Sequence, residues 1–518
     1  MRGSAVGYPG RGATVARLAL WTVPAIVALL AVLAVVVTQS TWLARRLERV
    51  LGATFDGTAR VGAVDVRLAP TVTIEIVDLE IRHRGRVDVE PLVRAARVRL
   101  TASIVQLLRS SPRVAHAYVE GLDLRLPPKG DRPSVAGAVA RGYEFVIERL
   151  DADRTTFAVL PGEPNKTPRV VDIQGVRLAG VGPHVAIPFE ARLTNPKPIG
   201  DIWSEGRFGP WDAAAPRNTP VTGTYRFDHA DLSTIAGIRG TLSSSGDYDG
   251  RLDSLNVHGH TDTPDFALST AGNAVPLSTT FDAVVDGTSG DTVLERVDGR
   301  WLSTRFTARG RITREERTRG HRVQLEVTLP EARLRDVLTL ALKGRPFMDG
   351  TLRLTTAFDL RPGEADTVRR LRLAGRFDMA RARFLRPDVQ RKVDELSRRA
   401  QGRPSASDSD DTLSAMTGRF EMTRGVVAFE ELRFAVRGAT VALAGHCDIA
   451  DPRVALRGQL TMDASVSQTM TGAKSWLLKV VDPLFRRRGA GAVIPLSIAG
   501  TPEAPQVSVD VKRIFSRR

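Results

Sequence analysis

Strict alternation of apolar and polar residues is the feature that most constrains how this chain folds. It is clearest from Gly418 to Asp463, where charged or polar residues separate apolar ones. Successive side chains of a β-strand point to opposite faces, so this pattern predicts strands that are apolar on one face and solvated on the other. Turns at Arg424-Gly425 and Arg437-Gly438 divide the stretch into an antiparallel meander.

Seven apolar residues of this meander are candidates for the lining of a lipid-binding groove. They are Phe420, Leu432, Phe434, Val441, Leu443, Leu456 and Leu460. Alternation alone does not distinguish an open groove from a closed sandwich, because either arrangement hides one face of each sheet. Both arrangements therefore stay open on the sequence alone.

The same period of two recurs from Val61 onward and predicts a mainly β chain. The 45 glycines, 30 prolines and 6% aromatic residues also suit many short strands joined by turns. A shift of the apolar phase at Ile76-Val77 predicts a β-bulge. In the proline-rich stretch 130–220 we expect strands near Val170 to Leu178 and Val185 to Leu193, and we interpret its many turns as edges and loops of the same sheet. A second strand opening, GRFDM at Gly375, is related to GRFEM at Gly418.

A few short helices are expected between the strands. One follows Thr101 or Ser103, either of which can cap its N-terminus. The expected helices cover an amphipathic segment from Trp42 to Phe55, then Ser103 to Leu108, Ser134 to Gly142, Leu334 to Leu342 and Pro387 to Arg399.

The uncharged run from Leu18 to Val37 predicts a transmembrane helix over 18–38. At about 1.5 Å per residue it spans about 30 Å, the thickness of a bilayer core, whereas the apolar run of a secretory signal is shorter. Arginines flank the run on both sides, so charge does not fix its orientation. A long domain crosses largely regardless of its charge, so we place the residues after the helix outside the cytoplasm.

The net charge of +16 and the pI near 10.7 would suggest a nucleic-acid partner in a cytoplasmic protein. The membrane segment argues against that, and the arginines alternate with apolar residues along strands, as in Arg370 to Leu373. This layout is typical of a solvated sheet face, so no nucleic-acid partner is expected, although anionic lipid headgroups remain an alternative. The single cysteine, Cys447, excludes an intramolecular disulfide.

A second apolar segment, Ser475 to Phe485, is followed at once by three arginines. Two interpretations compete: a helix that caps the apolar face of the sheet, or an interfacial helix that binds a membrane or a partner. The candidate membrane-interface residues are Trp476, Leu477, Leu484, Phe485, Arg486, Arg487 and Arg488.

The sequence contains no convincing catalytic or metal-binding pattern. His258 and His260 share one face of a strand beside Asp262, but a third fixed ligand is not evident, which favours an exposed strand. The chain contains no GxSxG elbow, phosphate loop, dinucleotide fingerprint or CxxC pair. We therefore expect no enzymatic activity, no cofactor and no metal.

The order of these features resembles the AsmA-like family of bacterial inner-membrane-anchored periplasmic proteins, of the AsmA, TamB and YhdP type. At the front the likeness lies in VGAVDVRLAPTVTIEIVDLEI, VRLTASIVQLL and VAHAYVEGLDLRL; at the back it lies in GRFEMTRGVVAFEELRF and VIPLSIAGTPEAPQVSVDV. It covers the anchor, residues 45–128 and residues 371–518. The resemblance implies an elongated, curved β groove lined with apolar side chains, without cofactor or catalytic residues, that helps phospholipid move toward the outer membrane.

This resemblance organises the chain into five segments. They are a short tail over 1–17, the transmembrane helix over 18–38, an N-terminal AsmA-like β unit with an amphipathic entry helix over 39–128, a middle β region over 129–370, and a C-terminal AsmA-like β unit over 371–518. The expected function is binding or conducting phospholipid acyl chains from the inner membrane. The alternative is a structural or assembly factor that acts on envelope proteins by protein–protein contacts.

Overall fold

The computed structural model describes 40–54, 57–68, 71–83, 90–107, 113–126, 146–159, 169–182, 185–211, 215–270, 273–315, 318, 320–363, 365–403, 413–448, 453–464, 492–501 and 505–509. The protein is mainly β, with few helices, as the alternation predicts. It divides into two compact units, which are described separately: residues 1–195 with 202–220, and residues 196–201 with 221–518.

The first part of the chain forms strands that pair in sequence order. Its elements are α2 (Ser40–Thr54), β1 (Gly57–Arg67), β2 (Val72–His83), β3 (Val93–Ala102), α3 (Ile104–Leu107), β4 (Arg113–Leu126), β5 (Val146–Val159), β6 (Arg169–Val181), β7 (Ile187–Pro196), β8 (Ile199–Phe208) and η1 (Pro216–Asn218). Neighbours from β1 to β7 pair antiparallel, except that β4 and β5 run parallel.

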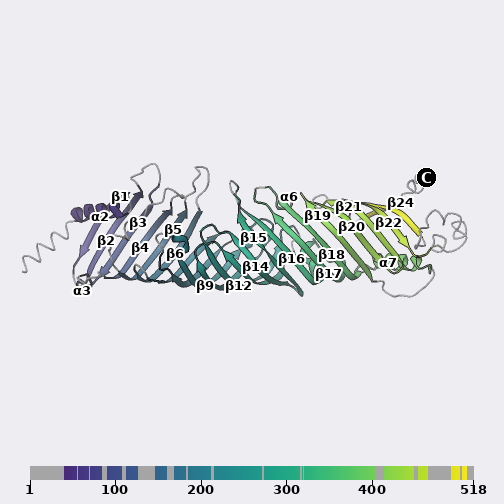
Figure 1. Ribbon diagram of the computed structural model, residues 1–518, viewed down its shortest axis with the longest axis horizontal. Coiled ribbons are helices and arrows are strands. Elements are labelled where there is room, and N and C mark those ends of the chain that lie inside the picture. The colour runs from purple at the N-terminus through teal and green to yellow at the C-terminus, as the bar shows by residue number, and fades with distance from the viewer. Residues whose placement is uncertain are drawn as a thin grey trace, which may run out of the picture. The chain divides into compact units, whose positions relative to one another are not determined.

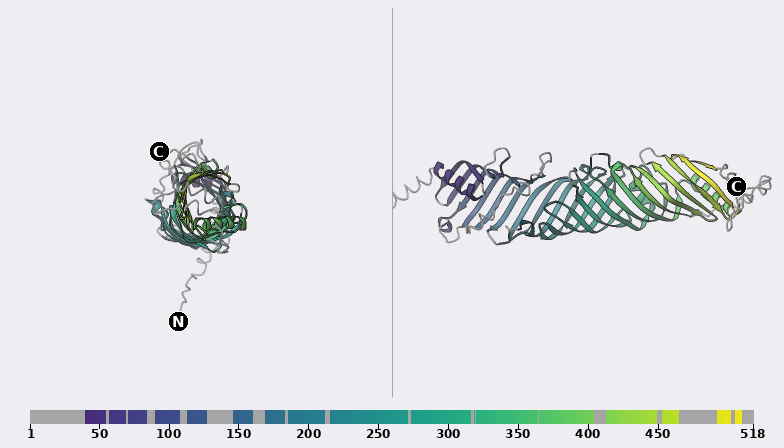
Figure 2. Two further views of the ribbon diagram at one scale, coloured as in Figure 1. Left: turned by 90° about the vertical axis from the view of Figure 1, so that its right-hand side faces the viewer. Right: turned by 45° about the horizontal axis from the view of Figure 1, so that its top comes forward.

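The second unit is a longer antiparallel array in which each strand from β11 to β24 pairs with the next along the chain. Figures 1 and 2 show these strands side by side in chain order, from teal to yellow. The elements are β9 (Pro220–Asp231), η2 (Leu232–Thr234), β10 (Ile238–Arg239), β11 (Thr241–Arg251), β12 (Ser254–Leu268), β13 (Val275–Val285), β14 (Thr292–Trp301), β15 (Thr304–Arg314), β16 (His321–Arg333), α5 (Leu334–Ala341), β17 (Met348–Leu360), α6 (Thr367–Arg370), β18 (Leu371–Phe384), α7 (Pro387–Ala400), β19 (Ser414–Thr423), β20 (Val426–Val436), β21 (Ala439–Asp448), β22 (Val454–Met462), β23 (Ala492–Gly500) and β24 (Pro505–Val509).

The strongest local predictions are confirmed. The meander is β19 to β22, and its turn at Arg424-Gly425 has positive φ at both residues, as a tight hairpin needs. Helices α2, α5 and α7 lie where periodicity places them. At α3, Ser103 Oγ accepts from the Gln106 N–H at 3.1 Å and Gln106 Oε1 accepts from the Ser103 N–H at 3.0 Å, which is a capping box.

Helix α2 packs on the first strands of the chain. Its Leu43 and Leu47 pack against a buried cluster that includes Val61, Val64 and other apolar residues of β1 and β2. Glu48 Oε1 also accepts a hydrogen bond from the backbone N–H of Val61 at 3.0 Å. Because β1 pairs only with β2 among the described residues, α2 supplies a partner to a backbone group of an edge strand.

The predicted bulge at Ile76-Val77 is wrong in position and kind. The register of β1 and β2 continues unbroken across both residues. The phase shift instead occurs at Asp78, whose φ of 53° turns the chain, and Gly62 opposite it is skipped in the same way. Because both strands shift together, the apolar face changes phase without a change of register.

The prediction for 130–220 is confirmed in part: β6 and β7 lie where two strands are expected, whereas the long strands β5 and β8 lie where only turns and loops are expected. In β5 the buried side chains include Ala152, Thr155 and Ala158, which are small or polar and give a weak alternating signal. The parallel pairing of β4 with β5 was likewise not expected, because a turn pattern does not reveal a crossover.

Some predictions fall outside the described residues: the transmembrane helix over 18–38, the helix over 134–142 and the segment with Trp476, Leu477, Leu484, Phe485 and Arg486 to Arg488. Among the residues that the structure describes, no helix is both long and apolar enough to cross a membrane.

A polar network crosses β4 to β7 on the solvated face. Asp151 accepts hydrogen bonds from Arg149 at 2.7 Å and Arg177 at 3.2 Å, and its Oδ2 lies 2.7 Å from His116 Nε2. Partial burial alone would raise the pKa of Asp151, but the hydrogen bonds from Arg149, His116 and Arg177 outweigh it and lower that pKa to about 2. The ionised carboxylate therefore links three strands, β4, β5 and β6, and Arg177 extends the network to Glu190 of β7.

We expect Asp151→Asn to lower the free energy of unfolding of this unit by about 2 kcal/mol at pH 7. The folded-state pKa lies below the unfolded value, so the stabilisation is complete above about pH 5 and is lost as pH falls toward 2. Urea unfolding of the full-length protein at pH 7 and pH 3 measures this loss. The control Glu190→Gln, at the half-exposed end of the network, should cost less than about 0.5 kcal/mol. A difference between wild type and Asp151→Asn that does not shrink at pH 3 would contradict the assignment.

Candidate functional site

The candidate site is one face of the sheet from β17 to β23, here called the apolar face. Its residues stand directly opposite one another across successive strands, in three rows. The first row is Leu352, Met379, Met416, Phe434, Val441, Leu460 and Ile494. The second is Leu354, Phe377, Gly418, Leu432, Leu443, Gly458 and Leu496. The third is Gly375, Phe420, Phe429, Gly445, Leu456 and Ile498.

All seven residues predicted as lining lie on this face: Phe420, Leu432, Phe434, Val441, Leu443, Leu456 and Leu460. A bulge in β20 makes this possible. Phe429 and Leu432 are separated by two residues, so regular alternation would place them on opposite faces. The register shifts between them, which leaves Glu430 and Glu431 exposed and turns both apolar side chains to the same side.

The apolar face is only partly buried. Leu432, Leu443 and Leu456 are 8–9% exposed, whereas Phe434 and Val441 are half-buried. Among the described residues, every member of the cluster that contains these three leucines belongs to one of the neighbouring strands β18 to β23. Its residues therefore pack sideways along the sheet, and this cluster includes no residue of a helix or of a facing sheet.

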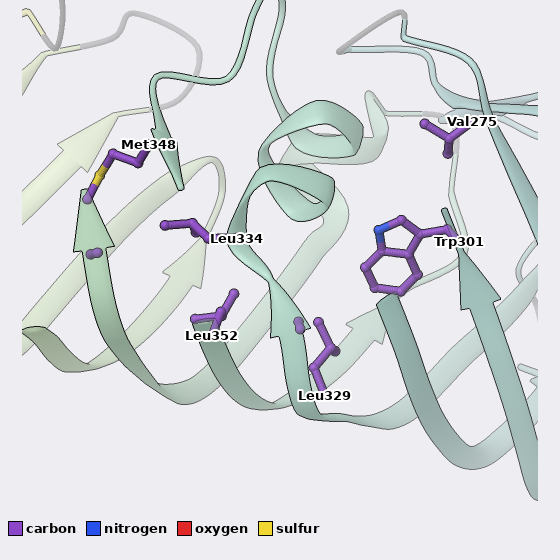
Figure 3. Packing of buried hydrophobic residues seen from close by; sticks show 8 residues of the cluster. Val275, Trp301, Leu329, Leu334, Met348 and Leu352 are labelled. Carbon is purple, nitrogen blue, oxygen red and sulfur yellow. The ribbon is translucent and has the colours of Figure 1, made fainter. Parts of the chain in front are cut away.

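Helices cover the apolar face at one end of the strands. Leu334 of α5 packs with Trp301, Leu329 and Leu352, and Figure 3 shows this cluster gathered around the helix. Farther along the sheet, Val393 and Ala400 of α7 pack on Val436, Ala439 and Met462. The chain bulges where these helices meet the strands, for example between Leu329 and Ala332 in β16.

Asp336 fixes α5 to the strands beneath it. Its Oδ2 accepts from Ser303 Oγ at 2.6 Å, from the Ser303 N–H at 3.1 Å and from Thr304 Oγ1 at 3.0 Å. The carboxyl group is therefore buried and accepts from three donor groups, as a buried polar group requires. This helix is part of the scaffold at the end of the apolar face.

The histidines are placed as the sequence favours, on an exposed strand face. His258 Nδ1 lies 2.8 Å from Asp282 Oδ1, and His260 Nε2 lies 2.7 Å from Asp262 Oδ2. The hydrogen bond with Asp282 raises the pKa of His258. Each histidine thus has its own carboxylate, and the part of the chain that the structure describes contains no group of three or more residues able to hold a metal ion.

Sequence reasoning missed part of the face. Phe377 and Met379 of β18, and Leu496 and Ile498 of β23, belong to the same rows as the predicted residues. Their alternation was visible in the sequence, but the pairing of β18 with β19 and of β22 with β23 was not, because long segments separate those strands.

Comparison of the chain with protein-family models, with curated proteins and with solved structures gave no match. The chemistry of the apolar face therefore has to be interpreted from its own residues. A broad apolar surface without ionisable side chains can hold hydrocarbon by burial alone. Its three rows contain no general base and no nucleophile.

Gly458 is a position in these rows where the backbone needs a glycine. A Cβ atom there would lie 1.8 Å from the carbonyl oxygen of Ala442 in the adjacent strand. We expect Gly458→Ala to lower the free energy of unfolding by about 2–4 kcal/mol, measured by urea unfolding. In the control Gly344→Ala, the added Cβ atom meets nothing within 4 Å, and the only strain comes from the backbone φ of 88°. This variant should therefore lose only about 1 kcal/mol of unfolding free energy. Equal losses in the two variants would show that β21 and β22 do not approach as described.

Proposed function

We propose that the protein binds phospholipid acyl chains on the apolar face of β17 to β23 and contributes to lipid transport in the bacterial envelope. The observation that carries this proposal is an apolar surface of three rows, many of whose aromatic and aliphatic side chains are only partly buried in the described residues. A soluble protein rarely leaves so broad an apolar surface without a ligand or a partner. In this proposal the face lines a groove of AsmA-like type.

The proposal includes a location. The predicted helix over 18–38 anchors the chain in the inner membrane, and the β units lie in the periplasm. The inner membrane is then the source of the phospholipid ligand. The apolar run Leu18 to Val37 supports this location.

The proposed binding is non-specific toward the headgroup. Each buried methylene contributes about 0.8 kcal/mol, so an acyl chain gains affinity from contact with the rows alone. The rows contain no charged side chain that would select one headgroup. We therefore expect a mixture of phospholipids that follows the composition of the membrane.

The direct test is purification of the full-length protein in detergent and extraction of bound lipid for mass spectrometry. We expect phospholipid to remain bound through exchange into a second detergent and to be replaced by added fluorescent phospholipid. A lipid-free protein that also takes up no labelled phospholipid would overturn the proposal. In that case an assembly factor that acts through protein–protein contacts becomes the better hypothesis.

A pair of adjacent substitutions separates the two faces of one strand. Val441 lies on the apolar face between Phe434 and Leu460, and Ala442, the next residue, is exposed on the other side. We expect Val441→Asp to reduce bound phospholipid at least about tenfold, because a carboxylate opposes hydrocarbon there. Ala442→Asp should leave bound lipid unchanged.

Circular dichroism during heating provides the structural control for this pair. Because Val441 is only partly buried, Val441→Asp should keep its cooperative transition. Unfolding of Val441→Asp alone would indicate a closed core instead of an open groove. Equal lipid binding by both variants would show that the ligand lies elsewhere.

A further inference from the structure

The motif Gly-Arg-Phe occurs three times, beginning at Gly206, Gly375 and Gly418, and the last two copies pair with each other. In β18 and β19, Gly375 stands opposite Phe420 and Phe377 stands opposite Gly418. A Cβ atom on Gly418 would lie 2.8 Å from Phe377 Cε1, and one on Gly375 would lie 3.0 Å from Phe420 Cζ. Each phenylalanine ring therefore covers the glycine of the other strand, which fixes the register of this antiparallel pair.

This register brings two arginines together on the solvated face. Arg376 and Arg419, the central residues of the two motifs, are directly opposite each other and both exposed. Like charges directly opposite each other in a sheet are destabilising. Across the next strand Arg419 stands opposite Glu431, but Glu431 Oε1 accepts from Arg433 Nε at 2.7 Å. In the described residues no carboxylate forms an ion pair with Arg376 or Arg419.

A hollow of about 720 Å³ on β14 to β19 includes both arginines. Four arginines and two glutamates line it, and two of the arginines are occupied: Arg309 bonds Glu326 at 2.8 Å, and Arg296 bonds Asp298 at 2.6 Å. Small side chains complete the lining: Thr307, Ala308, Thr328, Thr355, Thr356, Ala357, Ala374 and Gly375. Small side chains therefore form the bottom of the hollow, and the guanidinium groups of Arg376 and Arg419 are available to bind a ligand.

We propose that this hollow binds a phosphate-bearing ligand between Arg376 and Arg419. Arginine guanidinium groups match phosphate oxygens bidentately, and an anion between two opposed cations removes their repulsion. The source is either the headgroup of a phospholipid or a free phosphate compound, because both present the same group. The site lies on the opposite face from the acyl-chain site, so the two can be occupied and tested independently.

The test compares the full-length protein with Arg419→Gln in inorganic phosphate and in chloride at equal ionic strength. With a Kd on the order of 1 mM, about 20 mM phosphate shifts the wild-type equilibrium about twentyfold toward the folded state, or a few degrees in Tm. In chloride, Arg419→Gln should match or exceed the wild-type Tm, because it removes the like-charge pair. In phosphate it should show no gain.

The control Arg457→Gln removes an exposed arginine of β22 outside the hollow, and it should keep the full phosphate effect. Isothermal titration with inorganic phosphate and with glycerophosphoglycerol, a headgroup without acyl chains, identifies the source. Tighter binding of glycerophosphoglycerol supports a lipid headgroup, and tighter binding of phosphate supports a free phosphate compound. A wild-type protein that binds neither probe, or an Arg419→Gln variant that keeps the phosphate effect, would overturn the proposal. Bound acyl lipid in these variants should equal that of wild type, so failure here leaves the acyl-chain proposal untouched.

Discussion

Cross-strand register is the constraint on which the second unit depends. A slip of one residue between two strands would turn every apolar side chain of one of them to solvent, so each pairing has to be specified. The Gly-Arg-Phe copies specify β18 against β19 by placing a ring over a glycine in both directions. The bulge at Glu430 and Glu431 then keeps β20 in phase with its neighbours. Three unbroken rows from Leu352 to Ile498 result from these local devices.

The sequence predicts strands well where large apolar residues alternate with charged ones. The meander β19 to β22, the helices α5 and α7 and the capping box at Ser103 and Gln106 follow from patterns that a few adjacent residues contain. Strand β5 was not predicted because its buried positions include Ala152 and Thr155. These side chains are buried because they are small, not because they are strongly hydrophobic. A phase change near Ile76-Val77 was visible in the sequence, but its position at Asp78, the left-handed conformation of that residue and its matching partner Gly62 were not.

For the candidate site, the sequence predicts which residues share a face but not what that face meets. The seven lining residues came from alternation within single strands and all lie together. The pairing of β18 with β19 joins segments separated by α7, and the likeness of GRFDM to GRFEM in the sequence did not reveal that these two strands pair. The opposed arginines Arg376 and Arg419 depend entirely on that pairing, which is why the hollow that contains them was not foreseen.

Helix α2 limits how the chain can associate with other strands. The free edge of a sheet is a template on which a further strand adds by backbone hydrogen bonds. On β1, Glu48 already takes the N–H of Val61, and the apolar side of α2 lies over the same strand. Growth of the sheet by an added strand at this edge would first require α2 to detach and expose Leu43 and Leu47 to water. Any regulation of assembly at this edge would therefore act on the docking of one fifteen-residue helix.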